Sequence, residues 1–212
     1  MLSLHLPEGD LTVLALAAHP DDVEIGCGAT LLRLGQIRSV TGHVLVCTGS
    51  PERREESSTA ARRFWPSAPA QLHTADLPDG RLPAHWGDVK ELLEGTAAQV
   101  QPDLLFVPRS DDAHQDHRLL AELVPTVWRD ALVLHYEIPK WDGDLGAVTH
   151  YVPVDAQTAR RKVELLEECY PSQRGRDWWD AETFVGLMRL RGMECRSRYA
   201  EAFVVSKARL EP

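Results

Sequence analysis

The sequence predicts an α/β fold in which helices cover both faces of a mostly parallel sheet. Strand-like and helix-like segments alternate along the whole chain. The strand-like runs are continuously apolar rather than alternating, which is typical of strands buried on both faces. The length of 212 residues is sufficient for one sizeable domain with its own core.

The first half of the chain opens on the apolar run LTVLALAA, which predicts a buried strand. Pro51 suits the first turn of a later helix, and LPDG at 77–80 predicts a turn. In chain order we expect a strand at 11–18, a helix at 24–38, a strand at 40–48, a helix at 51–65, a short strand near 70–75 and a helix over roughly 86–100.

The second half opens on the apolar run DLLFVP, which predicts a central strand. The polar loop RSDDAHQDH at 109–117 then leads into a helix that ends near Arg129. In chain order we expect a strand at 103–108, that helix, strands at 131–138 and 149–154, helices at 155–169 and near 180–192, and a final strand at 200–206.

Histidines follow two of the predicted strands, at the point where each strand ends. His19 comes directly after the first strand, and His114 and His117 come after the DLLFVP strand. In open α/β sheets, ligands bind beyond the carboxyl ends of the strands, near the point where the strand order reverses. We therefore expect both groups at one edge of the sheet, with an active site there.

The segment His19-Pro20-Asp21-Asp22 ends the first strand, since Pro20 has no N–H for a sheet ladder. One interpretation is structural: an aspartate caps the next helix and His19 is a satisfied polar residue. A cap needs only one acid, however, and a catalytic zinc takes imidazole and carboxylate ligands. His19 and Asp22 are then predicted to bind one ion, with Asp21 left free.

The glycines after this segment allow a second interpretation, a dinucleotide-binding turn. That turn requires a third glycine where Leu31 stands, and two acids occupy the place of the pyrophosphate. We therefore expect Gly26 and Gly28 to permit close approach of the helix to the sheet or to a substrate.

The segment HQDH contains a further histidine pair. It is interpreted either as a solvated, helix-capping loop or as the second half of a metal site. In the metal-site interpretation, His117 is the third ligand, His114 lies near the ion without binding it, and Asp116 orients His114.

The chain resembles the PIG-L/LmbE-type zinc-dependent N-deacetylases in AHPDDVEIGCGATL and HQDH, and more loosely in RREESSTAA, LPDGRL, YEIP, ECYPSQ and AEAF. Two positions depart from the family pattern: Val23 stands where a glutamate is common, and Asp112 stands where some members carry tyrosine. The resemblance implies these roles: metal ligands His19, Asp22 and His117; general base Asp21; oxyanion partner or acid His114, supported by Asp116; substrate contact Arg53. Asp79 is expected to line the same pocket.

The resemblance further implies a Rossmann-like three-layer sandwich, with residues 1–212 as one deacetylase domain. The implied reaction is removal of an N-acetyl group from an N-acetylglucosamine-type sugar or conjugate, with Zn²⁺ or another divalent metal as cofactor. Two alternatives stay open: an amidase for another small conjugate, such as a thiol conjugate, and a non-catalytic metal- or sugar-binding module.

Composition restricts the partners. The net charge of −9 disfavours nucleic-acid binding. The sequence contains no run of about 18 consecutive apolar residues, so no membrane-spanning helix is predicted. The four cysteines are widely spaced and the N-terminal segment lacks the features of a signal peptide, which indicates reduced thiols and a cytoplasmic location. A small amino sugar is the expected partner, and a homo-oligomer is compatible with such a fold.

Overall fold

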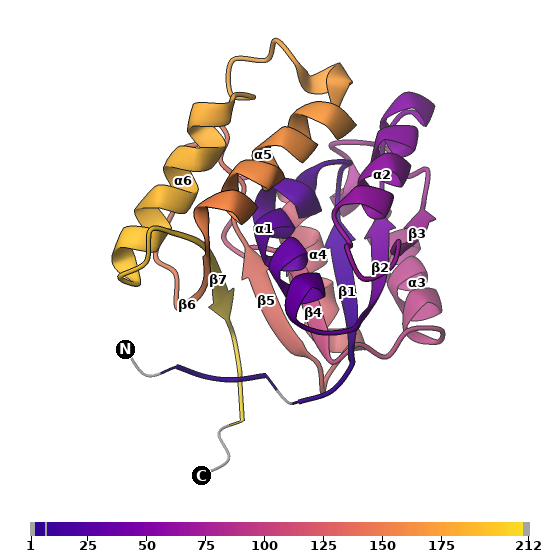
Figure 1. The fold of residues 1–212 in the computed structure, drawn as a ribbon. Coiled ribbons are helices and arrows are strands. Elements are labelled where there is room, and N and C mark those ends of the chain that lie inside the picture. Colours follow the sequence, from indigo (N-terminus) through magenta and orange to yellow (C-terminus); the bar gives the residue numbers. More distant parts are fainter. Residues whose placement is uncertain (1–2, 7, 210–212) are drawn as a thin grey trace.

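The computed structural model describes residues 3–6 and 8–209 and confirms the predicted α/β fold. Within these residues, one seven-stranded sheet has the order β3-β2-β1-β4-β5-β7-β6 (Figure 1). The strands are β1 Leu11–Ala17, β2 Val40–Val46, β3 Gln71–Thr74, β4 Leu104–Pro108, β5 Leu132–Tyr136, β6 His150–Val154 and β7 Tyr199–Val205.

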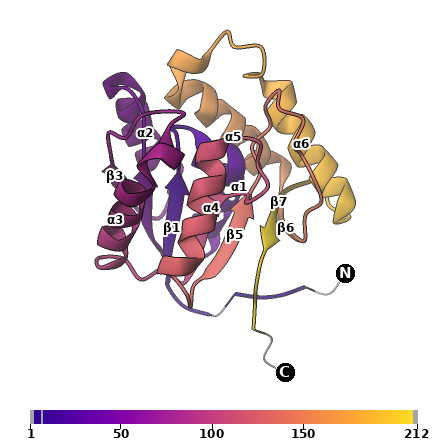
Figure 2. The ribbon, with the colours of Figure 1, turned by 180° about the vertical axis from the view of Figure 1, so that it is seen from behind.

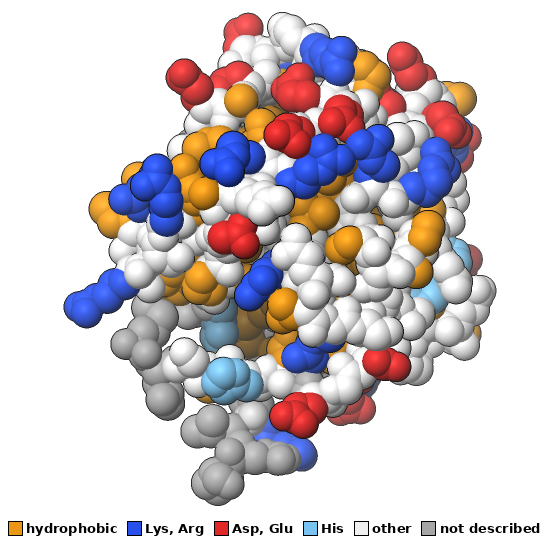
Figure 3. Space-filling view, in the orientation of Figure 1, with side chains coloured by type: hydrophobic (Ala, Val, Ile, Leu, Met, Phe, Trp, Pro, Cys, Tyr) orange, Lys and Arg blue, Asp and Glu red, His pale blue; other side chains and the backbone are white. Residues whose placement is uncertain are grey.

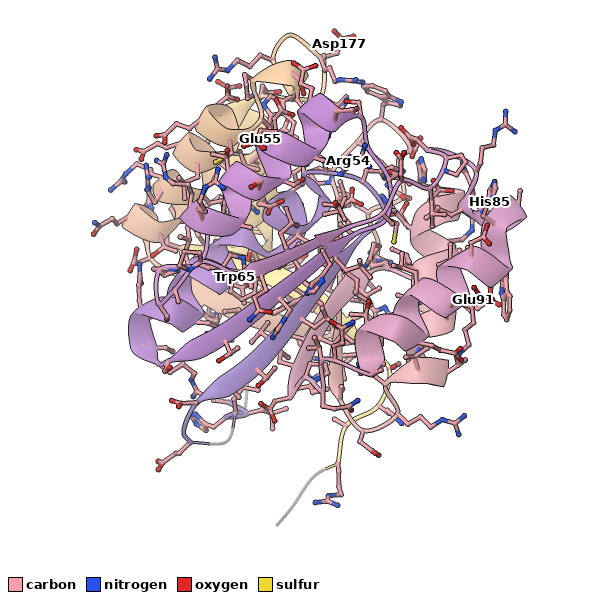
Figure 4. The ribbon with its side chains drawn as sticks, turned by 90° about the vertical axis from the view of Figure 1, so that its right-hand side faces the viewer. Arg54, Glu55, Trp65, His85, Glu91 and Asp177 are labelled. Atoms are coloured by element: carbon pink, nitrogen blue, oxygen red, sulfur yellow. The ribbon has the colours of Figure 1, made fainter. Side chains whose placement is uncertain are left out.

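Helices cover both faces of the sheet and make it the middle of three layers. They are α1 Asp22–Ile37, α2 Pro51–Arg63, α3 Trp86–Ala97, α4 Gln115–Val127, α5 Ala156–Cys169 and α6 Ala181–Glu194, with short 3₁₀ turns η1 Leu82–His85 and η2 Pro171–Gln173. α1, α2, α5 and α6 lie on one face (Figure 1), and α3 and α4 lie on the other (Figure 2). Figure 4 shows the sheet between the helix that carries Arg54 and the helix that carries Glu91.

The apolar run of β1 is buried on both faces, as its composition predicts. Val13 and Ala15 belong to the core beneath α1 and α5, whereas Leu14 and Leu16 belong to the core beneath α3 and α4. Side chains alternate between the two faces of a strand, so a strand with a core on each side needs apolar residues at every position.

The strands β3, β2, β1, β4 and β5 run parallel to one another. β7 enters between β5 and β6 and is antiparallel to both. Phe203 of β7 packs against Phe106 of β4, with 5.5 Å between the ring centroids. The sheet is therefore mostly parallel, with antiparallel pairing confined to one side.

The strand order reverses between β1 and β4. The chain moves outward from β1 through β2 to β3, and then returns to place β4 on the other side of β1. Ala15 pairs with Phe106, so the carboxyl ends of these two neighbouring strands lie side by side. The segments that begin at His19 and Arg109 therefore leave the same edge of the sheet.

Two glycines bring α1 close to the rest of the core. A Cβ atom at Gly26 would overlap the ring of Tyr136, and one at Gly28 would lie 2.7 Å from the ring of Phe64. The Tyr136 hydroxyl in turn donates to the carbonyl of Leu16, at 2.7 Å. These glycines permit close packing of the helix, which is one of the two roles expected for them.

Two helices begin at positions that differ from the predicted ones. α1 begins at Asp22, two residues before the predicted start, and α4 begins at Gln115, inside the predicted loop. The side chain of His114 caps α4 by accepting the N–H of Asp116. Asp116 and His117 therefore lie in the rigid first turn of a helix rather than in a loop.

Acidic and basic side chains are interspersed over the face formed by α1, α2, α5 and α6 (Figure 3). Arg63 pairs with Glu168, and Arg161 lies 3.1 Å from Glu164. Arg63 and Arg161 are thus paired with acidic side chains on this face. Among the helices of the described residues, none combines the length and the apolar character that a membrane crossing requires.

Replacing Gly26 with alanine tests the close packing of α1. The new methyl group would overlap the Tyr136 ring, so we expect Gly26→Ala to lower the free energy of unfolding by about 1–3 kcal/mol in urea denaturation. Gly95→Ala in α3 is the matched control, because its Cβ meets nothing within 4 Å. Helix propensity alone predicts a gain of about 0.5–1 kcal/mol there. Equal changes at both sites would contradict the packing argument.

Candidate metal centre

The turn after β1 carries His19, Asp21 and Asp22 into the junction with α1. Asp21 has a φ of 91°, a backbone conformation that non-glycine residues rarely adopt. Asp22 is the first residue of α1, and its Oδ2 accepts the backbone N–H of His19 at 2.8 Å. Such strain persists where the surrounding structure over-determines it, and it clusters at functional sites.

Three side-chain atoms from the two segments lie at metal-ligand spacing. His19 Nδ1 lies 3.2 Å from His117 Nε2 and 3.5 Å from Asp22 Oδ2. His117 Nε2 lies 3.3 Å from Asp22 Oδ2. Ligands of a tetrahedral zinc at about 2.0–2.2 Å are separated by about 3.3–3.6 Å. These atoms therefore fit three ligand positions of one ion and leave a fourth position for water or substrate.

Two other groups of potential ligands share His19 within the described residues. One joins His19 to His114 and His117, and the other joins it to Asp79 and Asp116. His114 Nδ1 already accepts a backbone N–H, and Asp116 already accepts two. Asp22 Oδ2 also accepts a backbone N–H, that of His19, so the candidate set of Asp22, His117 and His19 Nδ1 rests on the spacing of its three atoms.

Electrostatics keep this set ready for a cation. Burial alone would raise the pKa of Asp22, but His117 and His19 outweigh burial and hold the pKa well below its usual range. Burial alone would lower the pKa of His117, whereas Asp22 and Asp112 raise it to about 9. Asp22 is thus an ionised candidate ligand, and the same carboxylates that attract protons to the imidazoles would attract a divalent cation.

Each of the two histidines has a carboxylate at its other ring nitrogen. His117 Nδ1 lies 3.0 Å from Asp112 Oδ2, and His19 Nε2 lies 3.3 Å from Asp116 Oδ2. Lys140 Nζ lies 3.0 Å from Asp112 Oδ1. Carboxylates in such positions fix the orientation and the tautomer of metal-binding histidines.

The expected role of Asp116 toward His114 is corrected by these contacts. The fully buried Asp116 carboxylate contacts His19 and accepts the N–H groups of Gly80 and Leu82, at 2.8 and 3.0 Å. His114 instead accepts the backbone N–H of Asp116. The reason is the helix start at Gln115, because the cap directs the His114 ring toward the backbone of the first turn.

His114 lies beside the three-atom set without entering it. Its ring centroid is 4.6 Å from that of His19 and 4.8 Å from that of His117. Burial, together with His19 and His117, lowers its pKa. Because Nδ1 accepts a hydrogen bond, the neutral ring carries its proton on Nε2, which is then a donor for a ligand.

Asp21 is buried next to the ligand atoms but faces a different partner. Arg53 Nη2 donates to its Oδ2 at 2.7 Å and also to the carbonyl of Pro20. Burial raises the pKa of Asp21 to about 8, against the opposing effect of Arg53. A carboxylate with a pKa in this range is suited to accepting and returning a proton near neutral pH.

The two residues expected to contact substrate have different partners at the site. Arg53 is engaged with Asp21 and Pro20, and its side chain is partly exposed. Asp79 lies 3.2 Å from His19 Nε2, and 73% of its side chain is exposed. Asp79 thus stands at the open margin of the site, whereas Arg53 is bound to the Asp21 carboxylate.

Sequence reasoning gave no role to Asp112 or Lys140. Asp112 is one of two adjacent aspartates, and its neighbour Asp111 points to Arg109 instead. Only the three-dimensional contact with His117 distinguishes the two. The position of Asp112, two residues before a candidate histidine, was the one available signal.

Comparison with known families identifies the family of this chain. The sequence model described as GlcNAc-PI de-N-acetylase, PIG-L, matches residues 14–128, which include all three ligand candidates. The chain belongs to the PIG-L family.

Relatives of this PIG-L family member are deacetylases. The uncharacterized deacetylase YaiS of Escherichia coli (strain K12) is 31% identical over 139 residues, which cover 60% of this chain and 74% of the relative. With the family match and the His/Asp cluster, this defines the protein as a metal-dependent deacetylase, an amide hydrolase with a small-molecule substrate.

Solved structures share the fold over most of the PIG-L chain. The conserved protein TT1542 of Thermus thermophilus aligns with a TM-score of 0.73 and 24% identity, covering 95% of this chain and 97% of that one. The N,N'-diacetylchitobiose deacetylase of Pyrococcus horikoshii aligns with a TM-score of 0.69 and 20% identity, covering 92% and 83%.

The contact between Asp112 and His117 generates a prediction. We expect Asp112→Asn to weaken metal binding about 10–100-fold, because His117 loses the charged group that orients it. Competition with a chelator of known affinity measures the change. Asp111→Asn is the matched control, since its exposed side chain contacts Arg109, and it should leave the metal affinity unchanged. Equal affinities in the two variants would contradict this role of Asp112.

Proposed function

We propose that this deacetylase uses a zinc ion held by His19, Asp22 and His117 to remove the N-acetyl group from an N-acetylglucosamine-type sugar or conjugate. The main support is the set of three ligand atoms 3.2–3.5 Å apart beside an unligated, buried Asp21. Imidazole and carboxylate donors with an open position are typical of catalytic zinc. Iron and cobalt accept the same donors, so metal analysis is part of the test.

Asp21 is the general base in this proposal. A bound zinc ion polarises the substrate carbonyl and lowers the pKa of a water molecule to about 7. Asp21 accepts the proton of the attacking water and then holds the proton that the departing amine needs. Arg53 holds the carboxylate in place by donating to its Oδ2, and the backbone of Asp21 has the left-handed conformation.

His114 stabilises the oxyanion that forms when water adds to the amide carbonyl. The cap of α4 occupies Nδ1, so the Nε2–H group is the donor for the negatively charged oxygen. A neutral imidazole suffices for this role, and the lowered pKa of His114 favours the neutral form of the ring. Asp116 contributes indirectly by orienting His19, and removing one oxyanion donor typically costs about 10²–10³ in rate.

The substrate assignment follows the family description and the margin of the site. The family model names a GlcNAc-PI substrate, and the Pyrococcus horikoshii structure is named for N,N'-diacetylchitobiose. At the margin, Asp79 and Arg53 offer hydrogen-bond partners for sugar hydroxyl groups. Trp141 follows Lys140, the lysine that pairs with Asp112, and 69% of its surface is exposed. Its ring can therefore stack on a sugar.

The proposal covers residues 1–212 as one deacetylase domain. One sheet joins strands from Leu11 to Val205, which supports a single unit. The four cysteines are free thiols, which supports a reducing compartment such as the cytoplasm.

Asp21→Asn separates the base from the metal ligands. We expect this variant to bind zinc with nearly the parent affinity but to lose about 10²–10⁴ in turnover, because its amide cannot accept a proton. Metal content and acetate release are measured on the same preparation. His117→Ala, by contrast, should lose the metal itself. Parent-level turnover in Asp21→Asn would remove the base assignment.

Acetate release from a panel of N-acetylated sugars and conjugates tests the substrate class. We expect activity on N-acetylglucosamine-type compounds that disappears after chelation and returns with zinc. Activity restricted to a non-sugar amide, such as a thiol conjugate, would replace the substrate assignment while keeping the site. Metal binding without turnover of any compound would favour a binding module.

A further inference from the structure

A buried ion pair far from the ligand atoms in sequence lies against the helix that carries Asp22. Lys162 of α5 and Glu201 of β7 are each almost fully buried, and Lys162 Nζ lies 2.6 Å from Glu201 Oε1. Neither residue contacts the candidate metal ligands. The pair connects α5 and β7 to α1, and α1 and α5 lie on the same face of the sheet (Figure 1).

Both charges reach the backbone of α1. The Glu201 carboxylate accepts the N–H of Ala29 at 3.0 Å and the N–H of Thr30 at 2.7 Å. Lys162 Nζ donates to the carbonyl of Ile25 at 2.5 Å. In a regular helix, the N–H of Ala29 bonds to the carbonyl of Ile25. The ion pair therefore enters the hydrogen-bond ladder of α1 at this point, a kind of insertion that bends or segments helices.

The lysine passes close to Gly28 of α1. A Cβ atom at Gly28 would lie 3.6 Å from Lys162 Cγ, which is an ordinary contact distance, but only 2.7 Å from the Phe64 ring. The side chain of Lys162 therefore packs along α1 at this glycine, and the close approach that the glycine permits is that of Phe64.

Burial of two charges is not explained by stability alone. Removing a carboxylate and an ammonium group from water costs several kcal/mol per ion, and an apolar pair of similar size is often as stable. The pair instead supplies directional contacts: three hydrogen bonds fix one place on α1, and a fourth joins Lys162 to Glu201.

The fixed place lies one turn from the ligand-bearing end of α1. The N–H of Ile25 bonds to the carbonyl of Asp21 at 2.9 Å, so the residue whose carbonyl Lys162 binds is itself hydrogen-bonded to the strained residue. Tyr170 holds the same turn by donating to Glu24 at 2.7 Å. Arg53 holds its start through Pro20 and Asp21. The first turn of α1 is therefore restrained from three directions.

We propose that Lys162 and Glu201 are positioning residues for the metal centre: by gripping α1 at Ile25, Ala29 and Thr30, they fix the turn that presents Asp21 and Asp22. This inference rests on the proposed ligand role of Asp22. It assigns a function to two residues that touch neither the metal ligands nor the open margin of the site.

Glu201→Gln tests the proposal with zinc as the probe. Glutamine keeps the shape but offers one acceptor oxygen, so one N–H bond to α1 and the charge opposite Lys162 are lost. We expect the zinc dissociation constant, measured by chelator competition, to rise about tenfold or more. The absorption spectrum of the cobalt-loaded variant should also change, since that spectrum reports ligand geometry rather than stability.

Leu93→Ala is the matched control. Leu93 is fully buried in α3 on the other face of the sheet, so its truncation destabilises the fold without touching α1. Urea unfolding of the metal-free proteins should show lower midpoints for both variants, while only Glu201→Gln weakens zinc binding. The proposal would be overturned if the zinc affinity of Glu201→Gln stayed within about twofold of that of the parent, because loss of a residue that supports a ligand should change the affinity far more.

Two further variants keep the test decisive. If Glu201→Gln fails to fold, Lys162→Met/Glu201→Leu removes both charges together, leaves none unpaired and should show the same loss of zinc affinity. Asp22→Ala tests the ligand assignment separately. If Asp22→Ala retains zinc, the proposed function is refuted. If Asp22→Ala loses zinc while the ion-pair variants bind zinc normally, only the positioning role is refuted.

Discussion

The approach of His19 to His117 depends on the parallel pairing of β1 with β4. The two imidazoles lie 3.2 Å apart although 98 positions separate them in the chain. Neither segment could form the site alone, because each supplies only part of a coordination sphere. The reversal of strand order between β1 and β4 brings the two segments to one edge, and the helices α1 and α4 start there, so their first turns are rigid supports.

Such convergence concentrates negative charge. Four aspartates are buried around the site: Asp21, Asp22, Asp112 and Asp116. Carboxylates at close range raise one another's pKa unless cations or hydrogen-bond donors compensate for them. Arg53 compensates Asp21, Lys140 compensates Asp112, and two backbone N–H groups serve Asp116. Asp22 accepts the backbone N–H of His19 and faces the imidazoles of His19 and His117, an environment that a divalent cation would complete.

The sequence predicted the fold well because buried parallel strands leave a strong local signal. The continuously apolar runs located β1, β2, β4 and β5, and the residues after β1 and β4 located the site edge. The partners of each buried carboxylate could not be predicted, since they depend on contacts between distant segments. Asp116 accepts hydrogen bonds from Gly80 and Leu82, which lie 36 and 34 positions away in the chain. Glu201 reaches α1 from more than 170 positions away. Similarly, the start of α4 at Gln115 depended on the His114 cap, which changed the partner of Asp116.

The way Asp116 holds the neighbouring loop has an evolutionary consequence. Its carboxylate grips the main chain at Gly80 and Leu82, and a peptide N–H is offered by nearly every amino acid. The side chain of Asp79, just before these anchors, is largely exposed and is not required for the grip. Mutation of Asp79 can therefore alter the chemical character of this margin while the Asp116 carboxylate keeps its contact with His19. A lineage built on this scaffold can diversify the compounds it accepts without first rebuilding its metal centre.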